Sequence, residues 1–387
     1  MTSLLVIIVL LLVSVALWQL TKIFDLTQVG AKVNNTQVAD DNDNNVQGYL
    51  MFGFLAFIYI FTIYGLFKWG GLVLHTPASE HGSLIDNLMN ITWVLIFFVQ
   101  TVTQALLYYF GFKYRGRKDQ TALYFADNNR LEVIWSVIPA IVLAGLILYG
   151  LYAWSNIMFI DKDEDVIEIE LYAQQFKWTA RYSGNDNVLG KANVRYIEGV
   201  NTLGVDVADP NAQDDKVVSE LHLPKGKKIH FKMRSQDVLH SAYMPHFRAQ
   251  MNCVPGMVTE FAFTPIYTTS QMRDMPFMQD KVANINTIRA KKSIELVAKG
   301  EPALDPYTFD YLLLCNKICG ASHYNMQMKI VVDTPEDFKK WLKEKPTLVE
   351  EVKAANAAPA TDATLPAKGP DSTKATAPKM VAQVVKK

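Results

Sequence analysis

The chain has 387 residues, of which 50% are apolar and 20% are Asp, Glu, Lys or Arg, compared with roughly 25% charged residues in an average soluble domain. Its 38 basic and 38 acidic residues cancel, and no basic stripe stands out. This balance argues against a nucleic-acid partner. Three cysteines are too few for a disulfide scaffold, and their odd number leaves at least one thiol to explain.

Four stretches contain no charged side chain, at residues 2–21, 44–67, 87–112 and 133–160. Each supplies about the 20 mostly apolar residues that a helix needs to cross a bilayer. Buried core helices of a soluble protein are the alternative, but four charge-free runs argue against it. We predict transmembrane helices at 1–21, 46–68, 87–112 and 132–156. The first could instead be a signal peptide, although no basic residue precedes it, so three or four spans are expected.

The loops after the third and fourth spans differ in charge. Four basic residues follow the third span at 113–118, whereas four acidic residues and one lysine follow the fourth at 161–165. Positive residues near short loops mark the cytoplasmic side of a membrane protein. We therefore expect the loop between these spans to be cytoplasmic and everything after residue 160 to lie outside.

The spacing of apolar residues changes after the fourth span. Ile167, Ile169 and Leu171 alternate with Glu168 and Glu170, which is the period of a half-buried strand. Further strands are predicted at 229–233, 258–263, 293–297, 309–314 and 326–332. Short strands separated by Pro, Gly, Asn and Asp turns indicate a β-sandwich or Greek-key barrel. The predicted fold class is thus a membrane-anchored α region followed by an all-β external domain at 166–345.

The C-terminal region combines one predicted helix with a tail. Thr334 can cap a helix over Pro335–Lys343, with Asp337 three residues further on. From 351 to 387 the chain consists largely of Ala, Pro, Lys and Thr. Such a composition cannot bury enough apolar surface to fold, so this segment is predicted to be a disordered tail.

The segment Cys315–Met326 reads CNKICGASHYNM and holds two thiols, an imidazole and a thioether at intervals of four, four and three. Soft sulfur ligands together with imidazole favour copper, and two metals could share two bridging thiolates. The spacing alone leaves two alternatives open. One is a Cys315–Cys319 disulfide in an oxidising compartment. The other is a structural zinc site, although zinc seldom uses methionine and no C-x-x-C pair is present.

Further segments accompany this one. Residues 237–241 read DVLHS, residues 131–140 read LEVIWSVIPA, and Gln175–Tyr182 contains the pattern Q-(aromatic)-x-W. Together with the Cys315–Met326 loop, these segments resemble parts of subunit II of the haem–copper cytochrome c oxidases. They follow one another along the chain in the order found in that family. The resemblance covers approximately residues 88–342. It implies a cupredoxin fold for the external domain and disfavours the disulfide and zinc alternatives.

The resemblance also implies a dinuclear copper centre, CuA. Its ligands would be His240, Cys315, Cys319, His323 and Met326, with the backbone carbonyl of Lys317. The family usually has Glu at position 317, whose carboxylate reaches a magnesium ion at the interface with subunit I. Lysine cannot ligate that ion, and Asn252 stands where the family often has Asp, so the magnesium site is in doubt.

Residues around this centre carry further expectations. Asp237 is a candidate to orient a histidine ligand, with an ordinary turn carboxylate as the alternative. The resemblance implies that Phe176 and Trp178 receive electrons from cytochrome c, although core packing would explain them equally well. It also implies that Glu132 marks a proton channel of subunit I, the alternative being a boundary charge that reaches to water. Cys253 is expected to be a buried, inert thiol.

The connection between Gly256 and Cys315 is longer than is usual in the family. Its 271–300 segment contains Met272, Met275 and Met278, and methionine-rich loops make adaptable contact surfaces. One hypothesis is that this insertion contacts the electron donor; an inert surface loop is the other.

The resemblance implies a respiratory function. The chain would accept electrons from cytochrome c and pass them to haem a and the haem–copper centre of subunit I, where oxygen is reduced to water and protons are translocated. No C-x-x-C-H motif occurs, so the donor would be a separate cytochrome c or a cytochrome c domain of another complex.

Expected partners are subunits I and III and membrane lipid, without nucleic acid, in a bacterial cytoplasmic membrane with the cupredoxin domain on the periplasmic side. A membrane-tethered copper-binding or copper-delivery protein is the alternative. A copper-free quinol-oxidase subunit is disfavoured because all five copper-binding side chains are present.

Overall fold

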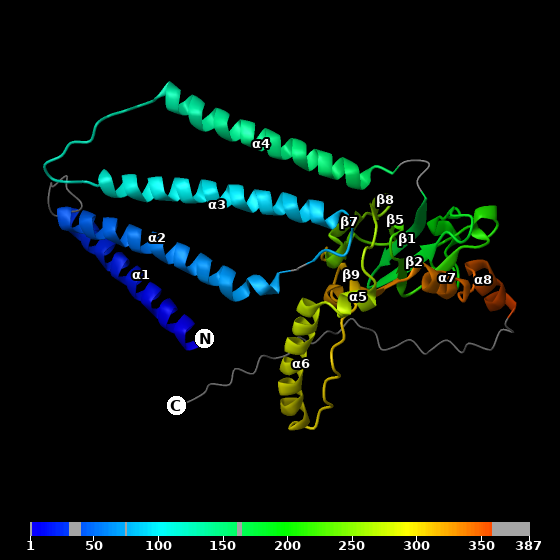
Figure 1. Cartoon of the computed structure of the whole chain (residues 1–387). Helices are drawn as coiled ribbons and strands as arrows, with labels where there is room; N and C mark the ends of the chain where they lie inside the picture. The colour runs from blue at the N-terminus through cyan, green and yellow to red at the C-terminus, as the bar shows by residue number, and fades with distance from the viewer. Residues whose placement is uncertain (1, 31–39, 74–75, 161–164, 358–387) are drawn as a thin grey trace. The chain divides into compact units, whose positions relative to one another are not determined.

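The computed structural model describes residues 2–30, 40–73, 76–160 and 165–357. The chain divides into two compact units (Figure 1). One comprises Met1–His75 with Leu84–Ala153, and the other Thr76–Ser83 with Trp154–Lys387. The first unit is helical, and the second is built on two β-sheets.

The helical unit contains four long helices: α1 (Thr2–Gly30), α2 (Asp41–Trp69), α3 (Gly82–Lys113) and α4 (Asn129–Met158). A short 3-10 turn, η1 (Gly70–Leu72), extends α2. Among the described residues, α2, α3 and α4 are long and apolar enough to cross a membrane, whereas α1 has a shorter apolar stretch, Ile7–Ile23. The predicted spans at 46–68, 87–112 and 132–156 lie inside α2, α3 and α4.

Helix α2 packs closely against the end of α3. A Cβ on Gly48 would lie 2.6 Å from the ring of Phe112, so this contact needs glycine, as is common where membrane helices approach closely. Beyond the helix, Arg115 donates to the Asn45 carboxamide over 2.7 Å, and Asn44 donates to the Gly116 carbonyl over 3.1 Å. These bonds hold the basic loop after α3 against the start of α2.

Two five-stranded sheets form a sandwich in the second unit. Sheet I has the order β3 (Lys216–Val218), β2 (Lys177–Tyr182), β1 (Val166–Gln174), β5 (Lys228–Ser235), β8 (Thr259–Phe263). Sheet II has the order β4 (Leu221–Pro224), β10 (Gln327–Asp333), β9 (Tyr311–Cys315), β6 (His240–Met244), β7 (Ala249–Cys253). The β1–β5 and β4–β10 pairs are parallel and the others antiparallel. The predicted membrane-anchored sandwich is confirmed.

Aromatic rings fill the space between the sheets. Phe263 of sheet I lies between Phe231, at a centroid distance of 5.3 Å, and Phe247, at 4.8 Å. Phe247 in turn contacts Tyr311 of sheet II at 4.7 Å. These rings are almost completely buried and supply much of the apolar burial that stabilises the sandwich.

The outer face of sheet I differs from the half-buried face that its sequence predicts. Glu170 and Arg181 are only 2% and 3% exposed. Arg181 donates to Glu170 over 2.6 Å and to Asp215 over 2.7 Å, and Arg234 also pairs with Glu170. The excursion between β2 and β3 covers this part of the sheet, so the alternating charges are paired inside the protein instead of facing water.

Helices and turns surround the sandwich: η2 (Val194–Tyr196), η3 (Pro210–Ala212), η4 (Pro245–Phe247), α5 (Thr269–Arg273), α6 (Pro276–Val297), η5 (His323–Asn325), α7 (Pro335–Lys343), α8 (Leu348–Ala357). The predicted helix at Pro335–Lys343 is confirmed, and the Thr334 hydroxyl accepts the Asp337 amide as expected.

The strand predicted at 293–297 is wrong, because these residues form the last turns of α6. The segment after α6 runs back along the helix, where Asn286 exchanges hydrogen bonds with Tyr307, and the Ser293 hydroxyl accepts the Leu304 amide over 2.9 Å. These contacts repeat at helical spacing, which the five-residue segment 293–297 taken alone could not reveal.

The prediction of a disordered tail from residue 351 is wrong for residues 351–357. Residues 351–357 belong to α8, whose Leu348 is buried in a cluster with Tyr172, Leu203, Val205 and Ala212. This buried residue anchors α8, whose Ala, Glu, Leu and Lys residues also favour a helix. Residues 358–387 lie outside the described part of the chain.

The buried ion pairs give a prediction for stability. Replacing Arg181 by Leu leaves the carboxylates of Glu170 and Asp215 buried without that partner, which should lower the free energy of unfolding by about 3–5 kcal/mol. Lys329→Leu, which removes an exposed ion pair with Glu220, should cost no more than about 1 kcal/mol. Denaturant unfolding followed by tryptophan fluorescence measures both, and equal small losses would contradict the assignment.

Candidate metal centre

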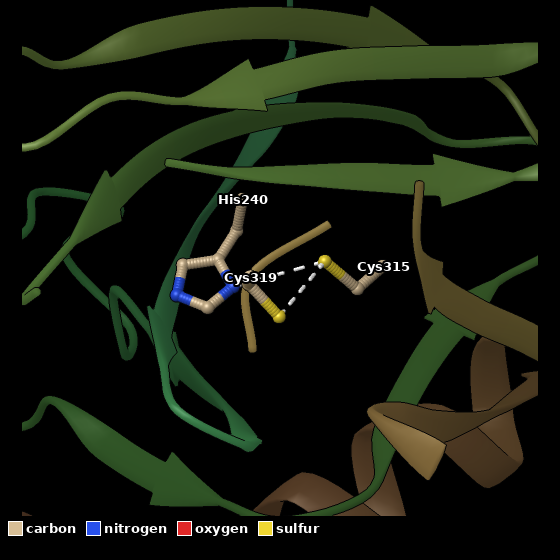
Figure 2. Close-up of side chains that lie close together, drawn as sticks. All are labelled: His240, Cys315 and Cys319. Atoms are coloured by element: carbon tan, nitrogen blue, oxygen red, sulfur yellow. Dashed lines mark hydrogen bonds between the residues drawn. The ribbon is translucent and has the colours of Figure 1, made fainter. Parts of the chain in front are cut away.

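The candidate ligands lie where strands β6 and β9 run side by side in sheet II. These strands are antiparallel, with Ala242 opposite Cys315. His240 opens β6 and Cys315 closes β9, so the pairing brings together residues that are 75 positions apart. Figure 2 shows the His240 ring close to the sulfurs of Cys315 and of Cys319, which lies in the loop after β9.

His240, Cys315 and Cys319 form one close group, whose potential ligand atoms all lie within 4.8 Å of one another. The Cys315 sulfur lies 3.7 Å from His240 Nδ1 and 3.8 Å from the Cys319 sulfur. A disulfide would bring the sulfurs to about 2.05 Å, and both cysteines are free. The structure therefore contradicts the disulfide alternative.

The remaining predicted donors surround the same two sulfurs. His323 Nδ1 lies 3.6 Å from the Cys319 sulfur, and the Met326 sulfur lies 3.8 Å from it. The carbonyl oxygen of Lys317 lies 3.2 Å from the Cys315 sulfur. Bonds of about 2.0–2.3 Å to a shared tetrahedral metal would separate donors by about 3.3–3.8 Å. The spacing of these donors thus fits metal coordination.

Asp237 contacts the imidazole of His240 on the side of the ring away from the cysteine sulfurs. Its Oδ1 lies 2.8 Å from His240 Nε2, which leaves Nδ1 directed at the Cys315 sulfur. Burial alone would raise the pKa of Asp237, but hydrogen bonds from His240, Gln175 and Val238 outweigh it and hold the pKa below its usual value. An anionic neighbour on one ring nitrogen fixes which nitrogen can bind a metal, as expected for Asp237.

The β1–β2 turn lies against the cysteine loop. Trp178 is 2% exposed, and its ring lies 6.2 Å from the His240 ring. The half-buried Phe176 contacts Gly320, where a Cβ would lie 2.8 Å from the Phe176 ring. Both aromatic residues are therefore next to the candidate ligands, as well as packed in the protein.

Two residues of this region were missed by sequence reasoning. Gly320 has a φ of +140° and no room for a side chain, and a glycine inside the ligand loop was the available signal. Gln175 donates from its carboxamide to the Cys319 carbonyl. Its place beside Phe176 was visible, but the contact with a loop 144 residues away was not.

Burial raises the pKa of the Cys319 thiol above its usual value. With a further contribution from the Cys315 thiol, the pKa of Cys319 reaches about 11. A metal binding at the Cys319 sulfur would have to displace the thiol proton. Cys253 is fully buried, as expected, and burial raises its pKa to about 12.

Glu132 lies in the first turn of α4 and is exposed. The Asn128 side-chain oxygen accepts hydrogen bonds from the backbone amides of Arg130 and Leu131 and so caps the start of α4. The Glu132 side chain lies in this capped first turn and is exposed. Lys317 and Asn252 stand where the family often has Glu or Asp near its magnesium ion. Their side chains are exposed as well.

Two of the three methionines of the 271–300 segment are buried, and Met275 is half-buried. Met272 and Met278 are buried at the base of α5 and α6, and Arg273 beside them donates to the Phe309 carbonyl over 2.7 Å. Met272 and Met278 therefore lie inside the protein, whereas the hypothesis that the insertion contacts the electron donor stays a prediction.

Comparisons with known proteins identify the family. A family model described as cytochrome c oxidase subunit II, transmembrane domain, matches residues 67–153. The alternative cytochrome c oxidase subunit 2 of Bradyrhizobium diazoefficiens is 33% identical over 274 residues, covering 70% of this chain and 84% of the relative. The cytochrome c oxidase subunit 2 of Thermostichus vulcanus is 23% identical over 301 residues, covering 70% and 77%.

Among solved structures, the periplasmic domain of subunit II of cytochrome oxidase from Bradyrhizobium japonicum aligns with 48% of this chain and 95% of that domain, at 18% identity and a TM-score of 0.27. The family match begins at residue 67, so α1 and most of α2 lie outside it. One-third identity over most of both sequences shows that this membrane-anchored chain belongs to the cytochrome c oxidase subunit II family.

Proposed function

We propose that this chain is the electron-receiving subunit of a cytochrome c oxidase and that it holds a dinuclear copper centre. The ligands are His240, Cys315, Cys319, His323, Met326 and the Lys317 carbonyl. The observation that carries the proposal is that the two cysteine sulfurs lie 3.8 Å apart, with an imidazole nitrogen and one further donor close to each of them.

Each sulfur faces its own imidazole. Cys315 has His240 Nδ1 at 3.7 Å and the Lys317 carbonyl at 3.2 Å, whereas Cys319 has His323 Nδ1 at 3.6 Å and the Met326 sulfur at 3.8 Å. A single tetrahedral zinc would need only four donors and would leave the thioether unused. Two copper ions would be held by the whole set, whose sulfur and imidazole donors favour copper.

Electron transfer favours a metal site whose ligands move little when the oxidation state changes. Here His240, Cys319 and Met326 are buried, and their loops are tied to strands of one sheet. When bound, the copper pair would supply one-electron redox chemistry between cytochrome c and the haem a and haem–copper centres of subunit I. A copper-delivery protein, the alternative, needs a site that releases its metal, and this burial disfavours it.

The aromatic residues of the β1–β2 turn are proposed to receive the electron. Phe176 lies over Gly320 in the ligand loop, and Trp178 lies beside the ring of His240. Both are therefore in van der Waals range of ligand-bearing segments, and Phe176 is the more exposed of the two.

The proposed setting is a bacterial cytoplasmic membrane with the sandwich on the periplasmic side. The basic loop at 113–118 favours a cytoplasmic position between α3 and α4. Partners are subunits I and III and cytochrome c or a cytochrome c domain. Because the Lys317 ammonium cannot bind a cation, the magnesium ion usual at the family's subunit interface is left out of the proposal.

Copper loading tests the assignment. The full-length chain in detergent should bind two copper ions and give an electron paramagnetic resonance signal from one electron shared by two equivalent nuclei. Cys315→Ser should abolish that signal because a bridging thiolate is lost, whereas Cys253→Ala, which changes a buried cysteine outside the set, should keep it. A single-copper signal from the unmodified chain, or an unchanged one from Cys315→Ser, would refute the dinuclear site.

We further propose that Glu132 takes up protons for subunit I. Its exposed carboxylate at the start of α4 can exchange protons with solvent. Glu132→Gln should slow oxygen reduction by the assembled oxidase several-fold while the copper signal stays unchanged, since the carboxamide cannot carry a proton. Asp119→Asn, an exposed carboxylate in the preceding loop, is the control and should have no effect. Full turnover of Glu132→Gln would exclude the role.

A further inference from the structure

A continuous set of hydrogen bonds connects the two ligand-bearing loops through a third element, the β1–β2 turn. The loop before β6 carries Asp237, whose Oδ1 lies 2.8 Å from His240 Nε2 and whose Oδ2 accepts the Gln175 amide over 2.7 Å. The Gln175 carboxamide then donates to the carbonyl of Cys319. The chain of contacts therefore runs from His240 through Asp237 and Gln175 to Cys319.

The turn that carries Gln175 is itself firmly placed. Gln174 and Lys177 pair at the end of the β1–β2 ladder, so only two residues, Gln175 and Phe176, lie beyond it. The amide of Gln236 donates to the Ala173 carbonyl over 2.9 Å, which attaches the loop before β6 to the same end of β1. A short turn on a paired ladder is a rigid support for neighbouring loops.

Close packing accompanies the hydrogen bonds. A Cβ at Gly320 would lie 2.9 Å from the Gln175 carboxamide nitrogen and 2.8 Å from the Phe176 ring. Both side chains of the turn thus press on the residue that follows Cys319. The turn contacts the cysteine loop by hydrogen bond and by packing at the same place.

We propose that Gln175 is a positioning residue of the metal centre, which sets the separation between the loop bearing His240 and the loop bearing Cys319. The expected changes in copper binding rest on the proposed function. The expected change in the mobility of the loop in the metal-free chain does not. Gln175 contacts no metal donor atom itself. It acts by holding the Cys319 backbone, and through Asp237 the His240 ring, in the arrangement that the donors require before metal binds.

The contact lies at a residue whose movement would affect several candidate donors. The Cys319 carbonyl belongs to the residue whose sulfur lies near His323, Met326 and Cys315. A shift of this backbone would therefore change several donor distances together. Groups behind the ligands of metal sites commonly change metal affinity by about 10–100-fold when removed.

Two substitutions isolate the contact. Gln175→Leu removes the carboxamide, and Gln175→Glu keeps the shape but places an acceptor against the Cys319 carbonyl. Neither changes the backbone amide that Asp237 accepts. Gln174→Leu, the same change at the preceding residue, is the matched control. Each variant is made in the full-length chain.

The first readout is hydrogen exchange of the metal-free chain. Amides of residues 316–326 should exchange at least about tenfold faster in both Gln175 variants than in the unmodified chain and in Gln174→Leu, because the loop loses its attachment. This result does not depend on copper. Unchanged exchange in both variants would overturn the proposal even if the chain bound no metal.

The second readout is the copper centre. Both Gln175 variants should bind copper roughly 10–100-fold more weakly in a chelator competition, with altered copper–sulfur absorption bands and a shifted reduction potential, while Gln174→Leu matches the unmodified chain. If the unmodified chain forms a copper pair and the Gln175 variants keep its affinity, spectrum and potential, the positioning role is refuted. If the unmodified chain forms no copper pair, the proposed function fails instead, and the exchange measurement alone decides the role of Gln175.

Discussion

The pairing of β6 with β9 is the constraint on which the candidate metal centre depends. It sets Ala242 opposite Cys315 and Tyr243 opposite Leu314, and two more bonds extend it into the ligand loop. Asn316 donates to the Ser241 carbonyl over 3.0 Å, and Cys315 donates to the Met326 carbonyl over 3.1 Å. The second bond closes the loop at its base, so its cysteines, histidine and methionine have little freedom relative to His240. Backbone pairing therefore arranges the candidate donors without the help of a metal.

Sheet I supports this arrangement from the other side of the sandwich. Its strand β1 ends in the turn that carries Gln175, and the same strand holds Glu170 in the buried ion pairs with Arg181 and Arg234. Buried ion pairs contribute little net stability compared with apolar packing, but they penalise any register that separates the charges. A slip of β1 by one residue would move each of its side chains to the opposite face of sheet I. Glu170 would then lose its buried partners, and apolar side chains would leave the space between the sheets. Correct register of β1 in turn places the turn over the cysteine loop.

Much of this could be predicted from the sequence because it depends on local pattern. Period-two alternation located β1 and β5, the helix cap at Thr334 located α7, and the spacing of donors from Cys315 to Met326 indicated a soft-metal site. The errors arose where distant contacts decide the structure. Residues 293–297 are helical, with a returning segment packed along α6. Glu170 is buried because an excursion from β2 covers it. No local pattern records such contacts.

Lys317 shows how one position can serve two separable purposes. Its carbonyl lies 3.2 Å from the Cys315 sulfur, whereas its side chain is exposed. The backbone contributes the same carbonyl whatever side chain follows, so the loop keeps its donor when Glu is replaced by Lys. The side chain, by contrast, presents a positive charge where the family usually presents a carboxylate. A partner surface that accepts a divalent cation beside a carboxylate would meet an ammonium group here instead. A lysine at this position therefore leaves the candidate donors in place and changes the electrostatics of the exposed surface around them.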